Sequence, residues 1–257
     1  KADALNVGLS FARGELVCAM DADTLIEQDG LQRMVRPFLY ATDVVATGGT
    51  IRVVNGSQVK HGRVEKTAVP TNLLAGVQVV EYLRAFLFGR LGWNRLGGNI
   101  IISGAFGLFQ REAVLNAGGY LHDTVGEDME LVVRLHRFVR DKKQNKRIAF
   151  LPHPVAWTEV PENFTSLRKQ RGRWYRGLRE SLMYHRAMLF RRKFGRIGWF
   201  ALPTFWIFEY YGPLVELAGY GFVLFFWLLE LLTGYRFINY DFLFAFGQPF
   251  VPKSRHI

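Results

Sequence analysis

Two aspartates, Asp21 and Asp23, directly follow a short apolar run at residues 15–20. We expect that run to form a buried strand, and residues i and i+2 of an extended chain project to the same face. Two carboxylates on one face can hold a divalent ion such as Mg²⁺, with the oxygens of a bound diphosphate completing its coordination shell. Such an ion neutralises the charge that develops on a departing diphosphate. Taken alone, the pair is equally compatible with a turn or a helix cap, where Asp is common.

A second acidic pair, Glu127 and Asp128, opens an expected amphipathic helix at residues 127–142. Thr124 stands three residues before Glu127, which is the spacing of a capping box, and acidic side chains suit the N-terminal end of a helix dipole. A purely structural role is therefore open for this pair. A carboxylate in this position can also act as a general base toward an acceptor hydroxyl. The two roles are compatible if Glu127 caps the helix while Asp128 faces a site.

The sequence Gln-Arg-Gly-Arg-Trp at residues 170–174 combines side chains that suit a sugar linked to a diphosphate. Arg173 can clamp a diphosphate by charge-assisted hydrogen bonds, and Trp174 offers a flat apolar face on which a sugar ring can stack. The motif lies in a strongly basic segment, because residues 165–196 contain eleven Lys and Arg and a single acid, Glu180. A basic amphipathic helix lying on acidic lipid is the alternative interpretation.

The rest of the chain must hold these groups in place, and its hydropathy pattern predicts alternating strands and helices. This alternation favours an α/β fold with a mostly parallel sheet and flanking helices, in which sites lie at the carboxyl ends of strands. Besides residues 15–20, the expected strands are residues 44–54, 99–102 and 148–158. Besides residues 127–142, the expected helices are residues 2–12, 29–39, 72–91 and 111–117.

Charge and hydropathy divide the chain into a globular domain at residues 1–162, a basic amphipathic interfacial segment at 163–196 and an apolar segment at 197–235. The apolar segment contains no Lys or Arg and exceeds the roughly 20 residues that span a bilayer once. Gly212 and Pro213 would kink one long helix or divide the segment into two short spans. Residues 236–257 are a tail or the start of a further span. A soluble protein with a very apolar C-terminal subdomain is the alternative.

The basic residues just before the apolar segment indicate the orientation of the protein in a membrane. Arg191, Arg192, Lys193 and Arg196 lie there, and the positive-inside rule then places the globular domain in the cytoplasm. We therefore expect a multi-pass protein of the inner (plasma) membrane. The single cysteine, Cys18, excludes an internal disulfide and is expected to be a buried thiol, which suits a reducing compartment.

Six features follow one another in a fixed order along the chain. They are Lys1-Ala-Asp-Ala-Leu-Asn6, Asp21-Ala-Asp23, Ser103-Gly-Ala-Phe106, Glu127-Asp128, Gln170-Arg-Gly-Arg-Trp174 and the apolar segment at residues 197–235. In this combination and order the chain resembles the processive family 2 glycosyltransferases, the group that includes cellulose, hyaluronan and poly-N-acetylglucosamine synthases. The resemblance implies a GT-A-like, Rossmann-like catalytic domain, and it covers nearly the whole chain. The Gln-x-x-Arg-Trp element is its most specific part.

On the donor side, the resemblance implies a role for five residues. Lys1 and Asp21 would lie near the diphosphate of a nucleotide sugar, and the uridine diphosphate sugars are the expected donors. Asp23, together with Asp21, would hold a divalent cation, either Mg²⁺ or Mn²⁺. Gln170 and Arg173 would close over the bound donor.

On the acceptor side, the resemblance implies that Asp128 is the catalytic base. Ser103, Gly104 and Glu127 would line the acceptor site, and Trp174 would contact the acceptor sugar. Asp128 would take a proton from a sugar hydroxyl, whose oxygen then attacks the anomeric carbon of the donor in line and inverts it. The partners implied are a nucleotide-sugar donor, a glycan acceptor, the lipid bilayer and subunits of an export complex.

The chain departs from the family pattern in two respects. Members typically carry Thr before the Glu-Asp pair, whereas this chain has Gly126. The strands that bind the nucleoside in the family would precede Lys1, and further membrane spans would follow, so we expect the sequence to be truncated at both ends.

Three other functions remain open from the sequence. A membrane glycosyltransferase that adds one sugar to a lipid is the nearest, although Gln170 and Trp174 speak against it. An inactive scaffold subunit of a polysaccharide export complex would not need Asp23 and Asp128. A basic nucleic-acid-binding protein is the third and the least favoured, because the net charge of +11 is concentrated next to the apolar segment and no nucleic-acid motif accompanies it. Nucleic acid is therefore not an expected partner.

Overall fold

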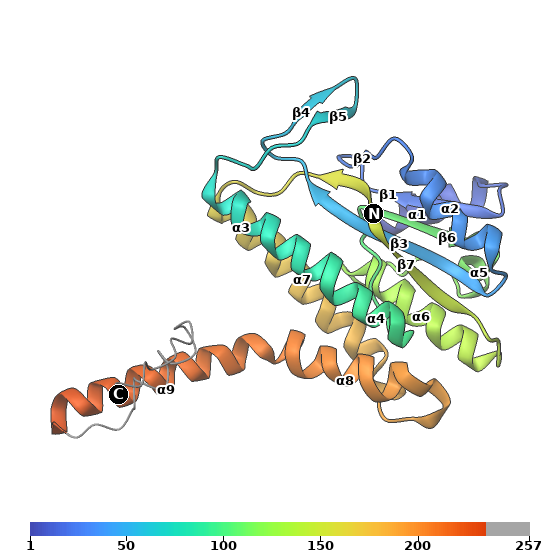
Figure 1. Ribbon diagram of the computed structural model, residues 1–257. Helices are drawn as coiled ribbons and strands as arrows, with labels where there is room; N and C mark the ends of the chain where they lie inside the picture. The colour runs from blue at the N-terminus through green and yellow to red at the C-terminus, as the bar shows by residue number, and fades with distance from the viewer. Residues whose placement is uncertain (235–257) are drawn as a thin grey trace, which may run out of the picture. The chain divides into compact units, whose positions relative to one another are not determined.

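The computed structural model describes residues 1–234 and divides the chain into two compact units, Lys1–Tyr210 and Tyr211–Ile257 (Figure 1). The first unit contains every residue to which the sequence assigns a role in chemistry. The second unit is described through a single helix, α9 (Gly212–Thr233). The expected tail or further span at residues 236–257 lies outside the described residues.

A five-stranded sheet forms the centre of the first unit. Its strands follow the spatial order β1 (Leu16–Met20), β6 (Phe106–Gln110), β3 (Val44–Val53), β7 (Arg147–Thr158) and β2 (Leu25–Ile26). Of the four neighbouring pairs only β3 and β7 are parallel, and the other three are antiparallel. The α/β class is confirmed, but the prediction of a mostly parallel sheet is wrong. Alternation of strands and helices fixes the order of elements along the chain, whereas the direction of β6 depends on its insertion between β1 and β3.

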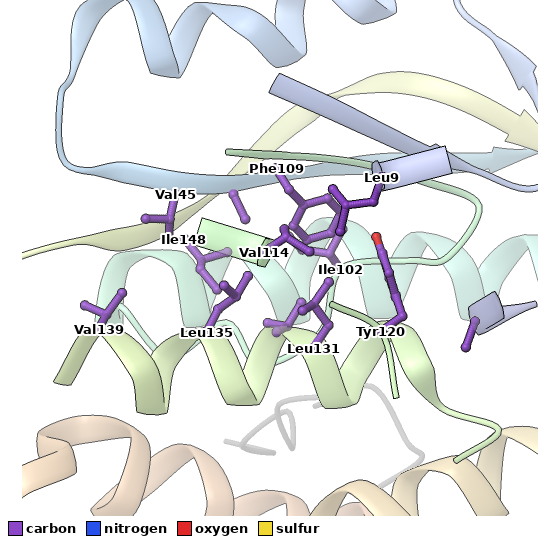
Figure 2. Packing of buried hydrophobic residues seen from close by; sticks show 13 residues of the cluster. Leu9, Val45, Ile102, Phe109, Val114, Tyr120, Leu131, Leu135, Val139 and Ile148 are labelled. Atoms are coloured by element: carbon purple, nitrogen blue, oxygen red, sulfur yellow. The ribbon is translucent and has the colours of Figure 1, made fainter. Parts of the chain in front are cut away.

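Helices α1 (Ala2–Phe11), α5 (Arg111–Asn116) and α6 (Glu127–Asp141) cover one face of the sheet. Figure 2 shows Leu131 and Leu135 of α6 pointing toward sheet residues such as Ile148. Phe109 of β6 belongs to this cluster, since alternate residues of a strand face opposite sides. Burial of such side chains, at about 1.5–3 kcal/mol each, is what fixes the start of α6 against the sheet.

The opposite face of the sheet is covered by a second set of helices. These are α2 (Gly30–Tyr40), α3 (Leu73–Tyr82), a π-helical segment η1 (Leu83–Gly89) and α4 (Arg90–Leu96). Phe106 and Leu108 of β6 pack here with Phe86. The expected helix at residues 72–91 is thus confirmed, and it is longer and changes its winding at η1. A small hairpin of β4 (Gln58–Lys60) and β5 (Arg63–Lys66) stands beside the main sheet.

Helix α7 (Phe164–Tyr184) packs against the face of α6 that is turned away from the sheet. Met129 and Val133 of α6 contact a third cluster, which includes Leu182 of α7 and extends to Ile197 and Leu202. The apolar residues at 197–202 therefore fold onto the first unit. Within residues 1–234, one helix is long and apolar enough to cross a membrane, Gly212–Thr233, and none of its most apolar stretch is buried.

Two further predictions from the sequence are wrong. Residues 99–102 form no strand: Ile100 and Ile102 are buried, but their backbone follows an irregular path. Cys18 is exposed, and it lies on β1, an edge strand of the described sheet. Ile100 packs with residues of α6 and α7, and Ile102 packs against the sheet. Periodicity alone cannot distinguish such burial from that of a strand.

Candidate active site

The first acidic pair lies where the sequence predicts it, at the carboxyl end of β1. The backbone N–H of Asp21 donates a hydrogen bond to the carbonyl of Ala105 (3.2 Å), which ties the end of β1 to the chain just before β6. Asp21 is half-buried, whereas Asp23 is exposed two residues later. The carboxylate of Asp23 forms no hydrogen bond or ion pair within residues 1–234. It is therefore available to an external ligand.

Lys1 joins the two acidic pairs. Its Nζ lies 2.6 Å from Oδ1 of Asp21 and 3.1 Å from Oε1 of Glu127, so the start of α1, the end of β1 and the start of α6 meet at one ammonium group. Burial favours the neutral amine and acts to lower the pKa of Lys1, but the hydrogen bond and the charge of Asp21, helped by Glu127, outweigh it and raise the pKa. Lys1 is consequently a permanent cation between two carboxylates.

The carboxylate of Asp128 is held by two backbone N–H groups. Its Oδ2 accepts a hydrogen bond from Gly104 (2.8 Å), and its Oδ1 accepts one from Met129 (2.8 Å). Burial raises the pKa of Asp128, the bond from Met129 opposes this, and the nearby charge of Glu127 adds to the increase. A carboxyl with a raised pKa is a stronger base when ionised, which suits a group that accepts a proton in the reaction.

Gly104 is needed for space. A Cβ atom at this position would lie 3.0 Å from Nζ of Lys1 and 3.1 Å from Oδ2 of Asp128, tighter than ordinary van der Waals contact. A small pocket here is lined by residues that the sequence assigned to both donor and acceptor. Its polar lining consists of Lys1, Ser103, Gly104, Tyr120, Glu127 and Asp128.

The expected capping box does not form. Gly126 is the N-cap residue of α6 and makes no side-chain cap. The hydroxyl of Thr124 accepts a hydrogen bond from the N–H of Gly126 (3.0 Å), while the carboxylate of Glu127 turns to Lys1. The ion pair with Lys1 competes successfully for the carboxylate that the capping box would use. Glu127 is buried, and it faces the candidate site together with Asp128.

The motif at residues 170–174 lies on α7, and its side chains form fewer hydrogen bonds and ion pairs than the two acidic pairs do. Gln170 is half-buried, and its Oε1 has no hydrogen-bond partner within the described chain. Arg173 and Trp174 are exposed. Among the described residues, no hydrogen bond or ion pair links these three side chains to Asp21, Asp23 or Asp128. The structure therefore brings the two acidic pairs, Lys1, Ser103 and Gly104 together, and it leaves Gln170, Arg173 and Trp174 on a neighbouring helix.

Residues on α3 and α4 were missed by the sequence analysis. Tyr82 is buried and stacks on Phe86 (5.3 Å between ring centroids), and the guanidinium of Arg90 lies 4.0 Å from the same ring. Burial raises the pKa of Tyr82, and the charges of Arg171 and Arg90 oppose it while those of Glu81 and Asp23 add to it. Burial lowers the pKa of Arg90 to about 10, against the charge of Asp128. The four-residue spacing of 82, 86 and 90 was the available signal, but it is typical of any helix face.

Two further contacts complete the surroundings of the site. Arg171 forms an ion pair with Glu81 on α3 and lies 4.8 Å from the ring centre of Trp174. Tyr120 lines the pocket beside Asp128, and its backbone exchanges two hydrogen bonds with the side chain of Asn6 (2.7 and 2.8 Å). It directly follows two glycines with positive φ (Gly118, +95°; Gly119, +70°), which was the signal for a shaped turn at this point.

The residues present fit a hard divalent cation that shares its shell with phosphate oxygens. Within residues 1–234 no group of three His, Cys, Asp or Glu side chains is arranged as a metal centre. Asp23 nevertheless offers an exposed carboxylate, and Asp21 keeps one oxygen that the ion pair with Lys1 does not use. One or two carboxylates completed by substrate phosphates are the usual protein ligands of Mg²⁺.

The mixed sheet with helices on both faces is a GT-A-like α/β fold. The structure of the protein is similar to that of a mannosyltransferase from Pyrobaculum calidifontis solved in complex with GDP-mannose and Mn²⁺, with a TM-score of 0.56, 20% sequence identity and coverage of 92% of this chain and 61% of that one. At this identity the likeness concerns the fold.

The chain belongs to glycosyl transferase family group 2, whose family model matches residues 16–239. It is 32% identical over 185 residues to the poly-β-1,6-N-acetyl-D-glucosamine synthase of Staphylococcus aureus strain COL, and 31% identical over 183 residues to that of Staphylococcus epidermidis. Each match covers 71% of this chain and 40% of the relative. The chain thus spans less than half the length of these synthases.

Proposed function

We propose that the protein transfers sugars from a nucleotide-sugar donor to a growing polysaccharide, with inversion at the anomeric carbon. One observation carries the proposal. The carboxylate of Asp128 is fixed by Gly104 and Met129 in a pocket that is also lined by Lys1, the ion-pair partner of Asp21. A base for an acceptor hydroxyl and charged groups for a diphosphate are thereby adjacent. N-acetylglucosamine is the first donor sugar to test, because it is the unit named in the staphylococcal synthases.

The acceptor half of the reaction belongs to Asp128. Its carboxylate takes the proton of a sugar hydroxyl, and the hydroxyl oxygen then forms the bond to the anomeric carbon as the bond to the diphosphate breaks. The two backbone N–H groups hold the carboxylate in place. Direct attack requires no nucleophile from the protein, and the pocket contains none that is activated by a neighbouring base.

The donor half depends on charge. Lys1 provides a cation next to Asp21, and Arg173 on α7 is proposed to bind the diphosphate once the donor is in place. Asp23 and Asp21 would hold a divalent cation, Mg²⁺ or Mn²⁺, which supplies positive charge to the leaving diphosphate. Gln170 would close on the donor, and its buried, unsatisfied Oε1 is the observation that favours a ligand there. Trp174 would stack on the acceptor sugar.

We also propose that the enzyme works at the cytoplasmic face of the inner membrane. Helix Gly212–Thr233 is long and apolar enough to cross a bilayer, and a basic segment precedes it. A catalytic unit held at the membrane could pass its product to a channel or to export-complex subunits. Addition of a single sugar to a lipid is the alternative, and the assay below separates the two.

The test measures polymer formation by the protein in membrane vesicles. UDP-N-acetylglucosamine and UDP-glucose are supplied separately with Mg²⁺, and Asp128→Asn is compared with the wild type and with Asp123→Asn, an exposed aspartate five residues away. We expect polymer from one donor, no effect of Asp123→Asn, and a loss of roughly 100- to 10,000-fold in Asp128→Asn, since general-base catalysis contributes that much. Equal products from wild type and Asp128→Asn would refute the role of Asp128. A single-sugar product would favour the glycolipid enzyme, and no turnover with either donor would favour a scaffold.

A further inference from the structure

Helices α6 and α7 touch through their backbones at two glycines. A Cβ atom on Gly126, the residue before α6, would lie 2.8 Å from Cα of Gly177, and a Cβ atom on Gly177 in α7 would lie 2.7 Å from Cα of Gly126. Real Cβ atoms do not approach another atom so closely. No side chain other than hydrogen fits at either position while the two helices keep their present distance.

Space, and not backbone conformation, makes glycine necessary here. Gly126 has φ −109° and ψ 46°, which lies outside the positive-φ region that favours glycine, and Gly177 lies within the regular helix α7. A glycine inside a helix costs about 1 kcal/mol relative to alanine. The chain accepts this penalty at Gly177, and the close approach to Gly126 is the structural feature that requires it.

The same face of α7 continues the contact toward its C-terminal end. Ser181, four residues after Gly177, is buried, and its hydroxyl donates a hydrogen bond to the carbonyl of Gly126 (3.4 Å). His185, four residues further, hydrogen-bonds through Nε2 to Oε1 of Glu130 (3.1 Å), and both side chains are buried. Positions four apart lie on one face of a helix, so residues 177, 181 and 185 form a single seam with α6.

This seam connects two parts of the proposed site that share no hydrogen bond or ion pair among the described residues. Asp128 lies two residues after Gly126 at the start of α6. Arg173 lies four residues, about one helical turn, before Gly177 on α7. A contact between backbones has no flexible side chain that could absorb a displacement. The distance between the two helices therefore fixes the backbone of Arg173 relative to Asp128, while the exposed side chain of Arg173 keeps its own freedom.

We propose that Gly126 and Gly177 form a positioning pair that sets the distance between the base Asp128 and the donor-binding residues of α7. This inference rests on the proposed function. It also gives a reason for the departure noted in the sequence, where Gly126 replaces the Thr that precedes the Glu-Asp pair in similar enzymes. A threonine side chain at this position would overlap the backbone of Gly177, so residue 126 must be small as long as α7 lies this close.

The experiment is a double-mutant cycle with Gly126→Ala and Gly177→Ala, assayed in membrane vesicles with the donor that the wild type uses. Gly8→Ala in α1 is the matched control, because a Cβ there meets no atom within 4 Å. Turnover is expressed per nucleotide-binding site, titrated with labelled UDP, so that misfolded protein does not contribute. We expect each single variant to lose roughly 10- to 100-fold in kcat with a much smaller change in donor KM, since displacements of about 1 Å have effects of this size.

The double variant distinguishes a shared contact from two independent defects. Once one alanine has separated the helices, the second has less to disturb, so we expect the loss in the double variant to be much smaller than the product of the single losses. Wild-type kcat in both single variants, or losses that multiply, would overturn the inference. A change in donor KM without a change in kcat would also overturn it. Absence of turnover in the wild type would instead contradict the proposed function.

Discussion

The acidic cluster and the motif on α7 hold their side chains in different ways. In the cluster, Lys1, Asp21 and Glu127 form a continuous set of ion pairs, and Asp128 receives two backbone hydrogen bonds. On α7, Arg173 and Trp174 are exposed, and within residues 1–234 the motif forms one ion pair, between Arg171 and Glu81. The proposed base is thus fixed before any substrate arrives, whereas the proposed donor clamp is free to rearrange.

This difference suggests which parts of the site move during turnover. Groups that are already held in place need no reorganisation when the transition state forms. They therefore stabilise the transition state more than groups that must first be ordered. The exposed side chains of α7 can close when a donor arrives, as lids do in other enzymes. The buried seam with α6 then holds the C-terminal half of α7 in place, while the exposed side chains before the seam can close on a donor.

The largest expected effect concerns stability and compares a buried ion pair with a more accessible one. Glu130 is fully buried and bonded to both Arg134 and His185, so Glu130→Ala leaves a buried cation without its partner and should lower the free energy of unfolding by about 3–5 kcal/mol. Glu81→Ala removes the half-buried partner of Arg171, whose ion pair is much more accessible to water than that of Glu130, and should cost less than about 1 kcal/mol. Denaturant unfolding of the detergent-solubilised protein measures both. Equal losses would show that the buried contact of α6 with α7 through Glu130 stabilises the fold no more than the ion pair between Arg171 and Glu81 does.

The contribution of Glu130 also depends on pH. Burial acts to raise its pKa, but the hydrogen bonds from His185 and Arg134 outweigh burial and lower it. A carboxyl whose pKa is lower in the folded state stabilises the fold above its unfolded pKa, and this stabilisation is lost as pH falls through the folded value. The difference between wild type and Glu130→Ala should therefore be full at neutral pH and shrink in acid. A difference that grows in acid would contradict this assignment.

The next effect tests the tight packing around the base. Gly104→Ala would place a methyl group 3.0 Å from Nζ of Lys1 and 3.1 Å from Oδ2 of Asp128, and one of the two must move. We expect kcat to fall roughly 10- to 100-fold, because the base loses its alignment. Gly92→Ala on α4 is the control, since a Cβ there meets no atom within 4 Å. If Gly104→Ala and Gly92→Ala have the same kcat, the acidic cluster can adjust to an added methyl group and is not more rigid than the motif on α7.

How much of this arrangement the sequence could predict depends on the range of the interactions. The positions of the helices at 29–39, 111–117 and 127–142 follow from local periodicity, and Asp21 at a strand end and Asp128 at a helix start follow from the same pattern. That both belong to one site was expected from the resemblance alone, and the ion pairs of Lys1 with Asp21 and Glu127 were not predicted. The antiparallel direction of β6, by contrast, results from pairing with β1 and β3, which no local pattern encodes.

Features that depend on one tertiary contact escaped the sequence analysis. The capping box failed because Lys1, which is 126 residues away in the sequence, attracts Glu127. Tyr82 and Arg90 were missed for a different reason, since their four-residue spacing from Phe86 is typical of any helix face. Gly126 stood out only as a departure from a pattern. The structure gives the reason, because the backbone of Gly177, distant in the sequence, leaves no space for a side chain at residue 126.

The smallest expected effect is a shift in the pH dependence of kcat, and it examines the charges around the base. Asp128 must be ionised to accept a proton, so kcat should fall as pH decreases through its pKa, which burial raises above the ordinary value. Glu127 raises this pKa further, whereas Lys1 lowers it. Glu127→Gln should therefore move the acid limb of the profile to lower pH, and Lys1→Met should move it to higher pH. Asp123→Asn, which is exposed, should leave the limb in place.

Opposite shifts in the two variants would establish that the acidic cluster tunes the base through its charges. Shifts in the same direction would mean that the variants act by displacing Asp128, so that geometry and not charge governs the cluster. In that case the cluster and α7 would differ only in how tightly they are packed. An acid limb that neither variant moves would assign the titration to another group, and the profile of Asp128→Glu, which keeps a carboxyl at this position, would then show whether residue 128 titrates in the reaction at all.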